Sequence, residues 1–598
     1  MISRSRLCLE SKSMKNRRRG LPVLLLPTVL LLLAQQSLRA GSATWNLNPT
    51  SDDWNTAANW TPNTVPNGPT DTATFAASSK NLVTLSADTE VGSIVFNSAA
   101  GAFTVTQGHL IDPFTLTISG AGIVNNSSFR QNFLSNEDTF GEPGTIQFTN
   151  NASAGTATSF IVAEGANLFF FNASSAGSGL FTNDGGDARG LDGGLLSFQD
   201  ASTAATSTVV TNGGPFKLAG GGMTLLLGNA TADHGTFMTQ GGAISTATGG
   251  VLQLSDNSTA AYASFTTEGG AVAGAGGGST QLLFSSTAAN GTFVTTGGAV
   301  SGAQGGILQF LYTSTAANAT LIANGGVDVT AGGSIQLGSE SDGGTARVEV
   351  FDNGNLDVSS HDAPGVTIGS LEGNGLVFLR ADNLTIGSKA LSTTLSGVVQ
   401  DGGIGGGSGG SISKTGNSAF TLTAANLYAG GTTVSAGTLI VSNTTGSATG
   451  TGTVQVNAGT LGGSGIISGA VTVNGGAFLA PAYGTKTQAA LTIQSALTFN
   501  AGSTYTYTFK AKKKQARTDR VVANGVTING ATFAFQGTAQ SALKQGLVLT
   551  AISNTAATPI TGIFANLLDG AILTVNGNNF QASYEGGDGN DLTLTVVP

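Results

Sequence analysis

Residues 286–298, STAANGTFVTTGG, carry a phrase that the chain repeats at a fixed spacing. The phrase reads STAAYASFTTEGG at 258–270 and STAANATLIANGG at 314–326, so the three copies share one 28-residue step. Gly-Gly pairs keep the same step at 185–186, 213–214, 241–242, 269–270, 297–298 and 325–326, and a second series runs through 193–194, 221–222, 249–250, 277–278 and 305–306. Matched positions over this distance indicate a repeat array.

Large apolar residues keep the same register in two columns. One column reads Phe181, Val209, Phe237, Phe265, Phe293 and Leu321, and the other reads Phe170, Phe198, Leu226, Leu254, Leu282 and Phe310. One unit holds three short apolar segments, GTFVTT, AVSGAQ and ILQFLYT, which suit strands and are too short for helices. Glycine pairs separate the segments, and we expect them to supply the positive φ that tight corners need.

The pattern predicts an all-β fold, a right-handed parallel β-helix with 28-residue coils and β caps at both ends. Equivalent segments would stack about 4.8 Å apart, with the Phe and Leu columns facing inward. A series of antiparallel hairpins in a sandwich or propeller is the alternative. A strict period without variation in loop length favours stacking.

The first 40 residues read as a secretion signal. Arg17, Arg18 and Arg19 precede the apolar run at 21–34, and small residues follow, with cleavage expected after Ala40 or Ala43. Met14 is an alternative start, and a retained membrane anchor is the alternative to a cleaved signal. The run is short for a bilayer span and contains a proline, and no later stretch is long enough for a transmembrane helix.

The amino-acid composition excludes several kinds of binding and metal site. Residues 41–598 hold 16 basic and 32 acidic residues, a formal net charge of −16, which argues against binding nucleic acid or anionic lipid through bulk charge. The single cysteine, Cys8, lies in the signal, so disulfides and cysteine-bearing metal sites are excluded. Gly accounts for 89 of 598 residues and charged residues for only 10%, as expected for short strands and tight turns.

The chain divides into a series of segments. We expect a signal peptide at 1–40, a tryptophan-containing N-terminal cap at 41–100, β-helix coils at 101–400 that are regular over 171–358, a second repeat pattern at 411–500 and a C-terminal β cap at 501–598. Trp45, Trp54 and Trp60 would pack in the core of the cap, or would instead form a sugar-stacking platform. Residues 401–410, DGGIGGGSGG, form either a flexible joint or a run of tight corners.

Residues 414–443 read KTGNSAFTLTAANLYAGGTTVSAGTLIVSN. This stretch resembles the autotransporter-associated β-strand repeat, through Lys414, Gly416, Leu422, Asn426, Tyr428, Gly430, Gly431, Thr432, Val434, Gly437, Thr438 and Leu439. It departs from that pattern at Ser418 and Ala419, where glycine is usual. The resemblance implies a β-helical, surface-exposed passenger region on a Gram-negative-type envelope. Members of that family end in a long membrane β-barrel, and this chain ends at LTLTVVP, so we expect that it does not translocate itself.

Few residues of the sequence are candidates for a catalytic or metal-binding site. Asp588 and Asp591, in GGDGNDLTL, fit one copy of a calcium-binding nonapeptide, but a turn before the last strand explains them as well. The densest acidic group of the array contains Asp184, Asp187 and Asp192, together with Arg189. The 28-residue period places no second row of carboxylates beside this group, and the nearest further base is Lys217. We therefore expect these residues to lie in turns. His109, His234 and His361 have no reason to converge. We expect no catalytic residue and no cofactor.

One cluster is basic. Lys510, Lys512, Lys513, Lys514, Arg517 and Arg520 lie in KAKKKQARTDR, either as a solvated hairpin tip or as a contact for lipopolysaccharide phosphates or an acidic polysaccharide.

The sequence thus predicts a secreted, non-enzymatic, β-helical cell-surface protein with a structural or adhesive role. Its partners would be extracellular polysaccharide or cell-envelope components, not nucleic acid. A carbohydrate-active β-helix enzyme is one alternative and would need a cluster of carboxylates across coils. A module that only promotes export or folding is the other.

Overall fold

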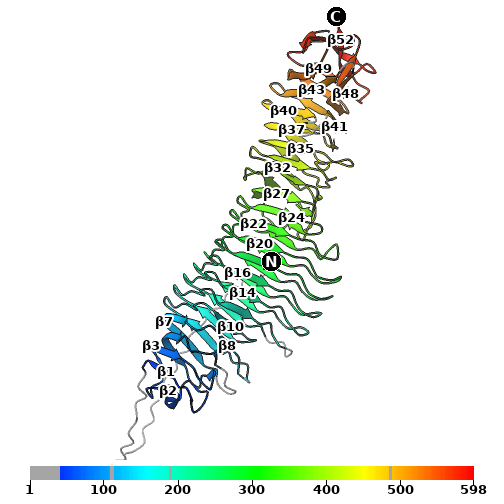
Figure 1. The fold of residues 1–598 in the computed structure, drawn as a ribbon. Helices are drawn as coiled ribbons and strands as arrows, with labels where there is room; N and C mark the ends of the chain where they lie inside the picture. Colours follow the sequence, from blue (N-terminus) through cyan, green and yellow to red (C-terminus); the bar gives the residue numbers. More distant parts are fainter. Residues whose placement is uncertain are drawn as a thin grey trace, which may run out of the picture. The chain divides into compact units, whose positions relative to one another are not determined.

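The computed structural model describes residues 41–107, 113–138, 140–187, 192–481, 483, 488–512 and 515–598. The predicted signal peptide, with Met14 and Cys8, lies outside these residues, as do His109, Arg189, Lys513 and Lys514. Apart from one 3-10 turn, η1 (Ala57–Asn59), the described secondary structure is β-strand throughout (Figure 1). No described helix is long and apolar enough to cross a bilayer.

The first sheet is a ladder in which each strand of the array pairs in parallel with the equivalent strand of the next coil. Its order is β2 (Trp60–Thr61), β1 (Ala43–Trp45), β3 (Gly68–Phe75), β5 (Thr89–Phe96), β7 (Thr115–Asn125), β9 (Thr145–Phe148), β11 (Asn167–Phe170), β13 (Leu195–Phe198), β15 (Met223–Leu226), β17 (Val251–Leu254), β19 (Ser279–Leu282), β21 (Ile307–Phe310), β23 (Ser334–Leu337), β25 (Asn355–Asp357), β28 (Leu376–Phe378) and β31 (Val399–Gln400). Only β1 and β2 pair antiparallel in it.

The second sheet runs alongside and extends further toward the C-terminus. Its strands pair in the order β4 (Leu82–Thr84), β6 (Thr104–Thr106), β8 (Gln131–Ser135), β10 (Thr158–Val162), β12 (Leu180–Asn183), β14 (Thr208–Thr211), β16 (Thr236–Thr239), β18 (Ser264–Thr267), β20 (Thr292–Thr295), β22 (Thr320–Ala323), β24 (Arg347–Val350), β27 (Ser370–Gly373), β30 (Thr393–Leu395), β33 (Ala419–Leu422), β35 (Thr438–Val441), β37 (Gly459–Gly463), β40 (Ala477–Pro481), β43 (Thr504–Lys512) and β47 (Thr532–Ala539). The short strand β44 (Gln515–Thr518) folds back antiparallel on β43.

Two further sheets form in the C-terminal half. The third contains β26 (Gly365–Ile368), β29 (Asn383–Ile386), β32 (Ser411–Lys414), β34 (Gly431–Val434), β36 (Val454–Val456), β39 (Val471–Val473), β42 (Leu497–Phe499), β46 (Val526–Asn529) and β49 (Thr561–Ile563). The fourth contains β38 (Ile466–Ile467), β41 (Ala490–Ile493), β45 (Arg520–Ala523), β48 (Val548–Asn554), β52 (Asp591–Val597), β51 (Asn578–Gly586) and β50 (Ile572–Val575), and its last strands pair antiparallel.

The register of these pairs confirms the parallel β-helix and excludes antiparallel hairpins for the array. Phe265 of β18 pairs with Phe293 of β20 in the next coil, and the rings stack with centroids 4.4 Å apart. Every member of both apolar columns is buried, so each coil continues one hydrophobic core. Connections between parallel strands of one sheet are right-handed in nearly all proteins, as expected for these coils.

Coil length follows the sequence period and then departs from it. Paired positions are 28 apart from Asn167–Leu195 to Ser279–Ile307 in the first sheet. The step then falls to 27 at Ile307–Ser334 and to 21 at Ser334–Asn355, so the coils that follow the regular array are smaller.

The glycine pairs and the segment between them differ from the sequence prediction. The segment at 299–304 between two glycine pairs forms turns and no strand, so each regular coil has two strands and not three. The paired glycines of this column do not adopt positive φ. They are needed because the coils touch: a Cβ on Gly221 would lie 2.2 Å from the carbonyl oxygen of Gly249 in the next coil.

Positive φ is found instead at the STAA corner, where alanine adopts it. Ala261, Ala289 and Ala317 have φ of 49°, 48° and 47°. The preceding threonines form a row of parallel bridges from coil to coil, such as Thr259–Thr287. Thr287 Oγ1 also accepts a hydrogen bond of 3.0 Å from the Ala289 backbone N–H. The repeated phrase is therefore a corner that is hydrogen-bonded within each coil and between coils.

A column of serines lines the core at the same corner. Ser174, Ser202, Ser258, Ser286, Ser314 and Ser341 are buried, and within the described residues their hydroxyls have no hydrogen-bond partner. Ala230 occupies the equivalent position in one coil. The column therefore tolerates a purely apolar side chain.

We expect Ser286→Ala to leave stability unchanged or raise it by about 1 kcal/mol, because it removes an unpaired buried hydroxyl. The neighbouring Thr287→Ala is the matched control and should lower stability by about 1 kcal/mol, because Ala289 N–H loses its acceptor. Urea unfolding of the full chain measures both. A loss in Ser286→Ala as large as that in Thr287→Ala would show that the hydroxyl has a partner.

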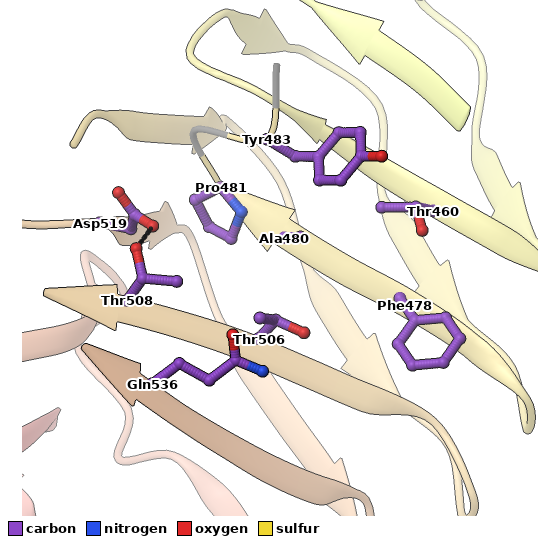
Figure 2. A pocket seen from close by; sticks show the side chains of 9 residues that line it. All are labelled: Thr460, Phe478, Ala480, Pro481, Tyr483, Thr506, Thr508, Asp519 and Gln536. Carbon is purple, nitrogen blue, oxygen red and sulfur yellow. Dashed lines mark hydrogen bonds between the residues drawn. The ribbon is translucent and has the colours of Figure 1, made fainter. Parts of the chain in front are cut away.

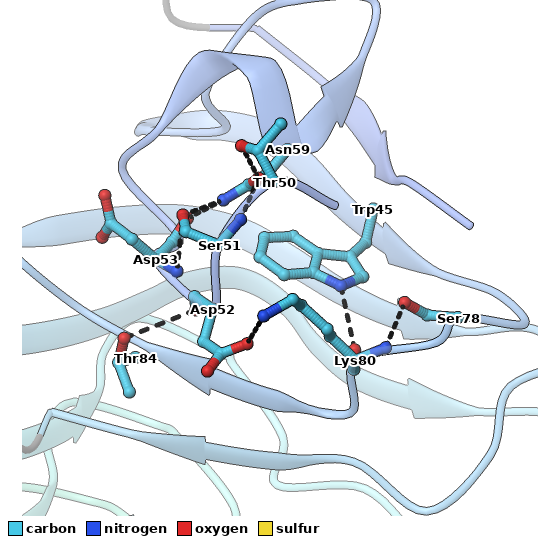
Figure 3. A network of polar contacts seen from close by, with 9 residues as sticks. All are labelled: Trp45, Thr50, Ser51, Asp52, Asp53, Asn59, Ser78, Lys80 and Thr84. Carbon is cyan, nitrogen blue, oxygen red and sulfur yellow. Dashed lines mark hydrogen bonds and ion pairs between the residues drawn. The ribbon is translucent and has the colours of Figure 1, made fainter. Parts of the chain in front are cut away.

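The N-terminal tryptophans are buried, which confirms the packing interpretation and overturns the sugar-platform alternative. Trp45, Trp54 and Trp60 are at most 1% exposed, and all three rings contact Phe75. Polar groups fix the surrounding loop, as Figure 3 shows. The indole N–H of Trp45 donates to Lys80 O, and the Lys80 ammonium lies 3.0 Å from the Asp52 carboxylate.

The glycine-rich stretch at 401–410 is a run of tight corners and not a flexible joint. Five of its glycines have positive φ. Asp401 accepts hydrogen bonds from Gly409 N–H and Gly410 N–H, at 3.0 and 2.9 Å. Asp357, on β25, accepts the Ile404 N–H at 2.9 Å and holds the stretch against the first sheet.

Candidate functional site

The residues that carry the family resemblance face inward. Lys414, at the end of β32, is only 1% exposed. Its ammonium donates to the carbonyl oxygens of Thr415 and Gly416, the latter at 2.9 Å, and reaches Ala436 O at 3.5 Å on the next coil. Burial lowers the pKa of this ammonium from 10.5 to about 8.

This lowered pKa makes local stability depend on pH. The unfolded lysine binds its proton up to about pH 10.4, whereas the folded one releases it near 8, so stability should rise between these values. Hydrogen exchange of β32 and β34 at pH 7.5 and 10, compared with Lys414→Met, measures the effect. Equal pH dependence in the wild type and the variant would contradict it.

Asn426 links three coils through its side chain. Its Oδ1 accepts the Val399 N–H of the preceding coil at 2.8 Å, and its Nδ2 donates to Ala448 O of the following coil at 2.5 Å. Tyr428 is fully buried, and its hydroxyl lies 2.6 Å from Thr432 Oγ1. These polar groups are satisfied inside the protein.

The motif glycines lie where coils approach closely. A Cβ on Gly416 would lie 1.9 Å from Gly387 O, and one on Gly437 would lie 2.3 Å from Gly416 O; both glycines have positive φ. Gly430 and Gly431 likewise face backbone atoms of adjacent coils, Thr438 begins β35, and Leu439 is buried. The inward-facing residues of the repeat, Lys414, Asn426 and Tyr428, thus fasten neighbouring coils together from inside.

The outer face of the second sheet, by contrast, carries a groove of about 400 Å³ close to the C-terminus. Thr460, Phe478, Ala480, Pro481, Tyr483, Thr506, Thr508, Asp519 and Gln536 line it (Figure 2). We name it the outer groove. Strands β37, β40, β43 and β47 form its floor, with Thr460 paired to Phe478 and Thr508 paired to Gln536.

Strand alternation sets the lining of the outer groove. On β43, Tyr505, Tyr507 and Phe509 point into the core, so Thr506 and Thr508 point outward. Phe478 is 42% exposed and Tyr483 is 51% exposed, so both side chains offer aromatic surface at the outer groove. Figure 2 shows Phe478 and Asp519 at opposite ends, with Thr506 between them.

Asp519 supplies the carboxylate of the outer groove. It is 2% exposed, accepts a hydrogen bond from the Thr508 hydroxyl, and accepts the Ala489 N–H at 3.3 Å. Burial raises the pKa of this carboxyl above its ordinary value, while these hydrogen bonds and Lys510 oppose the rise. The groove therefore combines aromatic surface, hydroxyls, an amide and a carboxylate.

A second, smaller pocket of about 330 Å³ is acidic. It brings Glu164 together with Asp184 and Asp187, along with Asn212 and Gln240. Burial raises the pKa of Asp184, and the nearby charge of Glu164 adds to the rise. Asp192 and Lys217 do not line it.

Glu164 was not predicted to lie at this pocket. The 28-residue period does not align it with the three aspartates. The coil that precedes them is shorter than the period, since Thr145 of β9 pairs with Asn167 of β11. Only the pairing register places Glu164 beside Asp184.

The remaining candidates stay apart. Asp591 Oδ1 accepts the Asn554 N–H at 2.9 Å, and burial raises the pKa of its carboxyl. His234 is exposed and contacts Asp233, whereas His361 is buried and bonds the backbone carbonyls of Ser341 and Asp362. Among the described residues, no group of three or more His, Cys, Asp or Glu side chains is placed to hold a metal ion.

Comparison with known proteins identifies the fastening motif. Residues 412–441 match the family model of the passenger-associated transport repeat. No curated protein matches the chain. Among solved structures, the Haemophilus influenzae Hap adhesin is similar at 11% identity and a TM-score of 0.27, over 88% of this chain and 64% of that one. Residues 412–441, including Lys414, Asn426 and Tyr428, therefore carry a passenger-associated transport repeat.

Proposed function

We propose that this chain is a secreted, non-enzymatic protein of the outer surface of a Gram-negative-type cell, with a structural or adhesive role. The observation that carries the proposal is the passenger-associated transport repeat at 412–441. Two of its strands, β33 and β35, belong to the second sheet, whose parallel pairing continues from β4 to β47. A surface protein without disulfides needs such ladders for its stability.

The outer faces of the coils support an adhesive role. On the first sheet, Gln281, Gln309 and Gln336 form a ladder with side-chain hydrogen bonds of 3.3 and 2.8 Å between neighbours. On the second sheet, Thr208, Thr236, Thr292 and Thr320 lie at equivalent outward positions. Repeated polar rows suit many weak contacts, whose avidity exceeds the affinity of each. The partners we expect are extracellular polysaccharide or cell-envelope components.

Fractionation of the native cells tests this proposal. We expect the chain in the outer-membrane fraction and accessible to antibody on intact cells. Recovery only from cytoplasm or periplasm would contradict a surface role.

An export or folding role for the repeat is compatible with its geometry, because its residues fasten coils together. Variants that loosen it should lower the amount of protein at the surface but leave the adhesion per exposed molecule unchanged. Deleting 411–500 is the extreme form of this test. Loss of adhesion per molecule would assign adhesion to the repeat itself.

The acidic pocket favours a second candidate function, a carbohydrate-active enzyme. Glu164 and Asp184 line one pocket on neighbouring coils, and the pKa of Asp184 is raised, as glycosidases require of their general acid. A degradation screen on polysaccharides with the full chain and with Asp184→Asn decides this. Cleavage that Asp184→Asn abolishes would replace the non-enzymatic proposal.

A further inference from the structure

The outer groove adjoins the most basic part of the chain. Residues 41–598 contain 16 Lys and Arg, and six of them lie between 510 and 520, where Asp519 is the only acid. Lys510 follows Thr506 and Thr508 on the outward face of β43, and Arg517 of β44 pairs opposite it. Both side chains are exposed. A chain that is acidic overall thus places positive charge at one end of a groove.

The residue types that line the outer groove suit a sugar. A pyranose ring has apolar C–H faces and a rim of hydroxyls, so it needs aromatic surface and hydrogen-bonding groups together. Phe478 and Tyr483 offer the half-exposed rings. Within the described residues, the side chains of Thr460, Thr506 and Gln536 make no hydrogen bond with the protein and are available to hydroxyls.

The positions of the charged side chains at the outer groove favour an acidic sugar. Asp519 is buried in the groove and engaged by Thr508 and Ala489, so its carboxylate suits a hydroxyl and disfavours an anion at that point. Lys510 and Arg517 are exposed beyond it and suit a carboxylate. A nucleic acid would place phosphates along the whole groove, including beside Asp519, and fits less well.

We infer that the outer groove binds a polysaccharide rich in uronic acid. A pyranose ring stacks on Phe478 and Tyr483, its hydroxyls bond Thr506 and Gln536, and the carboxylate of a neighbouring sugar meets Lys510 and Arg517. This inference rests on the proposed adhesive function and gives it a site and a partner class. The volume of about 400 Å³ and the open outer face of the sheet suit a short stretch of a long polymer.

Binding of the purified full chain to two matched polymers tests the inference. Polygalacturonate carries free carboxylates, and fully methyl-esterified pectin has the same backbone without the charge. We expect polygalacturonate to bind at least ten times more tightly at low salt, with an affinity that falls as salt rises. Equal binding of both polymers would mean that the ligand is neutral and would overturn the uronic-acid assignment, and no binding of either would overturn the site.

Variants distinguish the contribution of the aromatic rings to binding from that of the charged side chains. Phe478→Ala and Tyr483→Ala should each weaken polygalacturonate binding about tenfold at every salt concentration. The double variant Lys510→Gln/Arg517→Gln should weaken it several-fold and flatten the salt dependence. Phe284→Ala is the matched control, since Phe284 is 48% exposed on a distant coil and should leave binding unchanged.

Two outcomes would contradict the assignment. Unchanged binding in both ring variants would place the ligand elsewhere, and an equal loss in Phe284→Ala would indicate non-specific adsorption. Circular dichroism of each variant checks the fold. The assay uses purified protein, so its result does not depend on where the protein lies in the cell. A failure of the binding proposal can therefore be told apart from a failure of the proposed surface location.

Discussion

Gly221→Ala is expected to lower stability by about 3 kcal/mol, among the largest effects of any single methyl group in this chain. The added Cβ would lie 2.2 Å from Gly249 O and 2.5 Å from its carbonyl carbon, so two stacked coils must separate. Both atoms belong to the backbone and cannot move aside as a flexible side chain does. Hydrogen exchange of β15 and β17 in the full chain would detect the local loss of protection.

The adjacent Gly220→Ala is the matched control. A Cβ on Gly220 has only Asp192 Oδ1 near it, at 4.0 Å, and its φ is not positive. We expect a change in stability below about 1 kcal/mol. Similar losses in both variants would show that the glycines are needed for chain flexibility and not for coil contact.

Asn426→Ala is expected to cost about 3 kcal/mol, because it leaves Val399 N–H and Ala448 C=O without partners in the interior. Each unpaired buried group of this kind costs about 1–3 kcal/mol. Because the side chain joins three coils, protection should fall on both sides of it, in β31 and in the corner at 447–449. Urea unfolding with exchange readout measures both effects.

Asn417→Ala, at an exposed position of the same repeat, is the matched control. Its effect on stability should stay below about 0.5 kcal/mol, as for most surface substitutions. A loss confined to one side of Asn426 would show that it fastens only two coils. A loss as small as that of Asn417→Ala would mean that its hydrogen bonds are replaced by water.

The repeated columns made the fold predictable from sequence. The 28-residue period that relates Phe265 to Phe293 requires equivalent positions on successive coils, and burial of both rings follows from stacking. The glycine pairs were recognised as corners, but for the wrong reason. Whether a glycine provides positive φ or room for a neighbouring coil depends on the distance between coils, which sequence does not contain.

The candidate sites were much less predictable. Phe478, Thr506 and Asp519 have no motif in common. They meet because β40, β43 and the segment before β45 lie side by side. Alternation in β43 predicts outward threonines but not the groove above them. The acidic pocket was missed because one coil is shorter than the period.

The repeat motif was recognised from its residues, whereas its physical role required the structure. Sequence similarity cannot show that the Lys414 ammonium is buried among carbonyl oxygens or that Asn426 joins three coils. The calcium alternative at Asp588 and Asp591, like the segment boundaries, remains untested.

Surface exposure of the coils is the central claim, and one measurement tests it directly. Leu218 is 71% exposed at a glycine corner, so the recognition sequence of a specific protease can be inserted there without entering the core. Protease added to intact native cells should cleave the chain at this corner, while a periplasmic marker stays intact. An uncut chain in intact cells, cleaved only after lysis, would contradict the account.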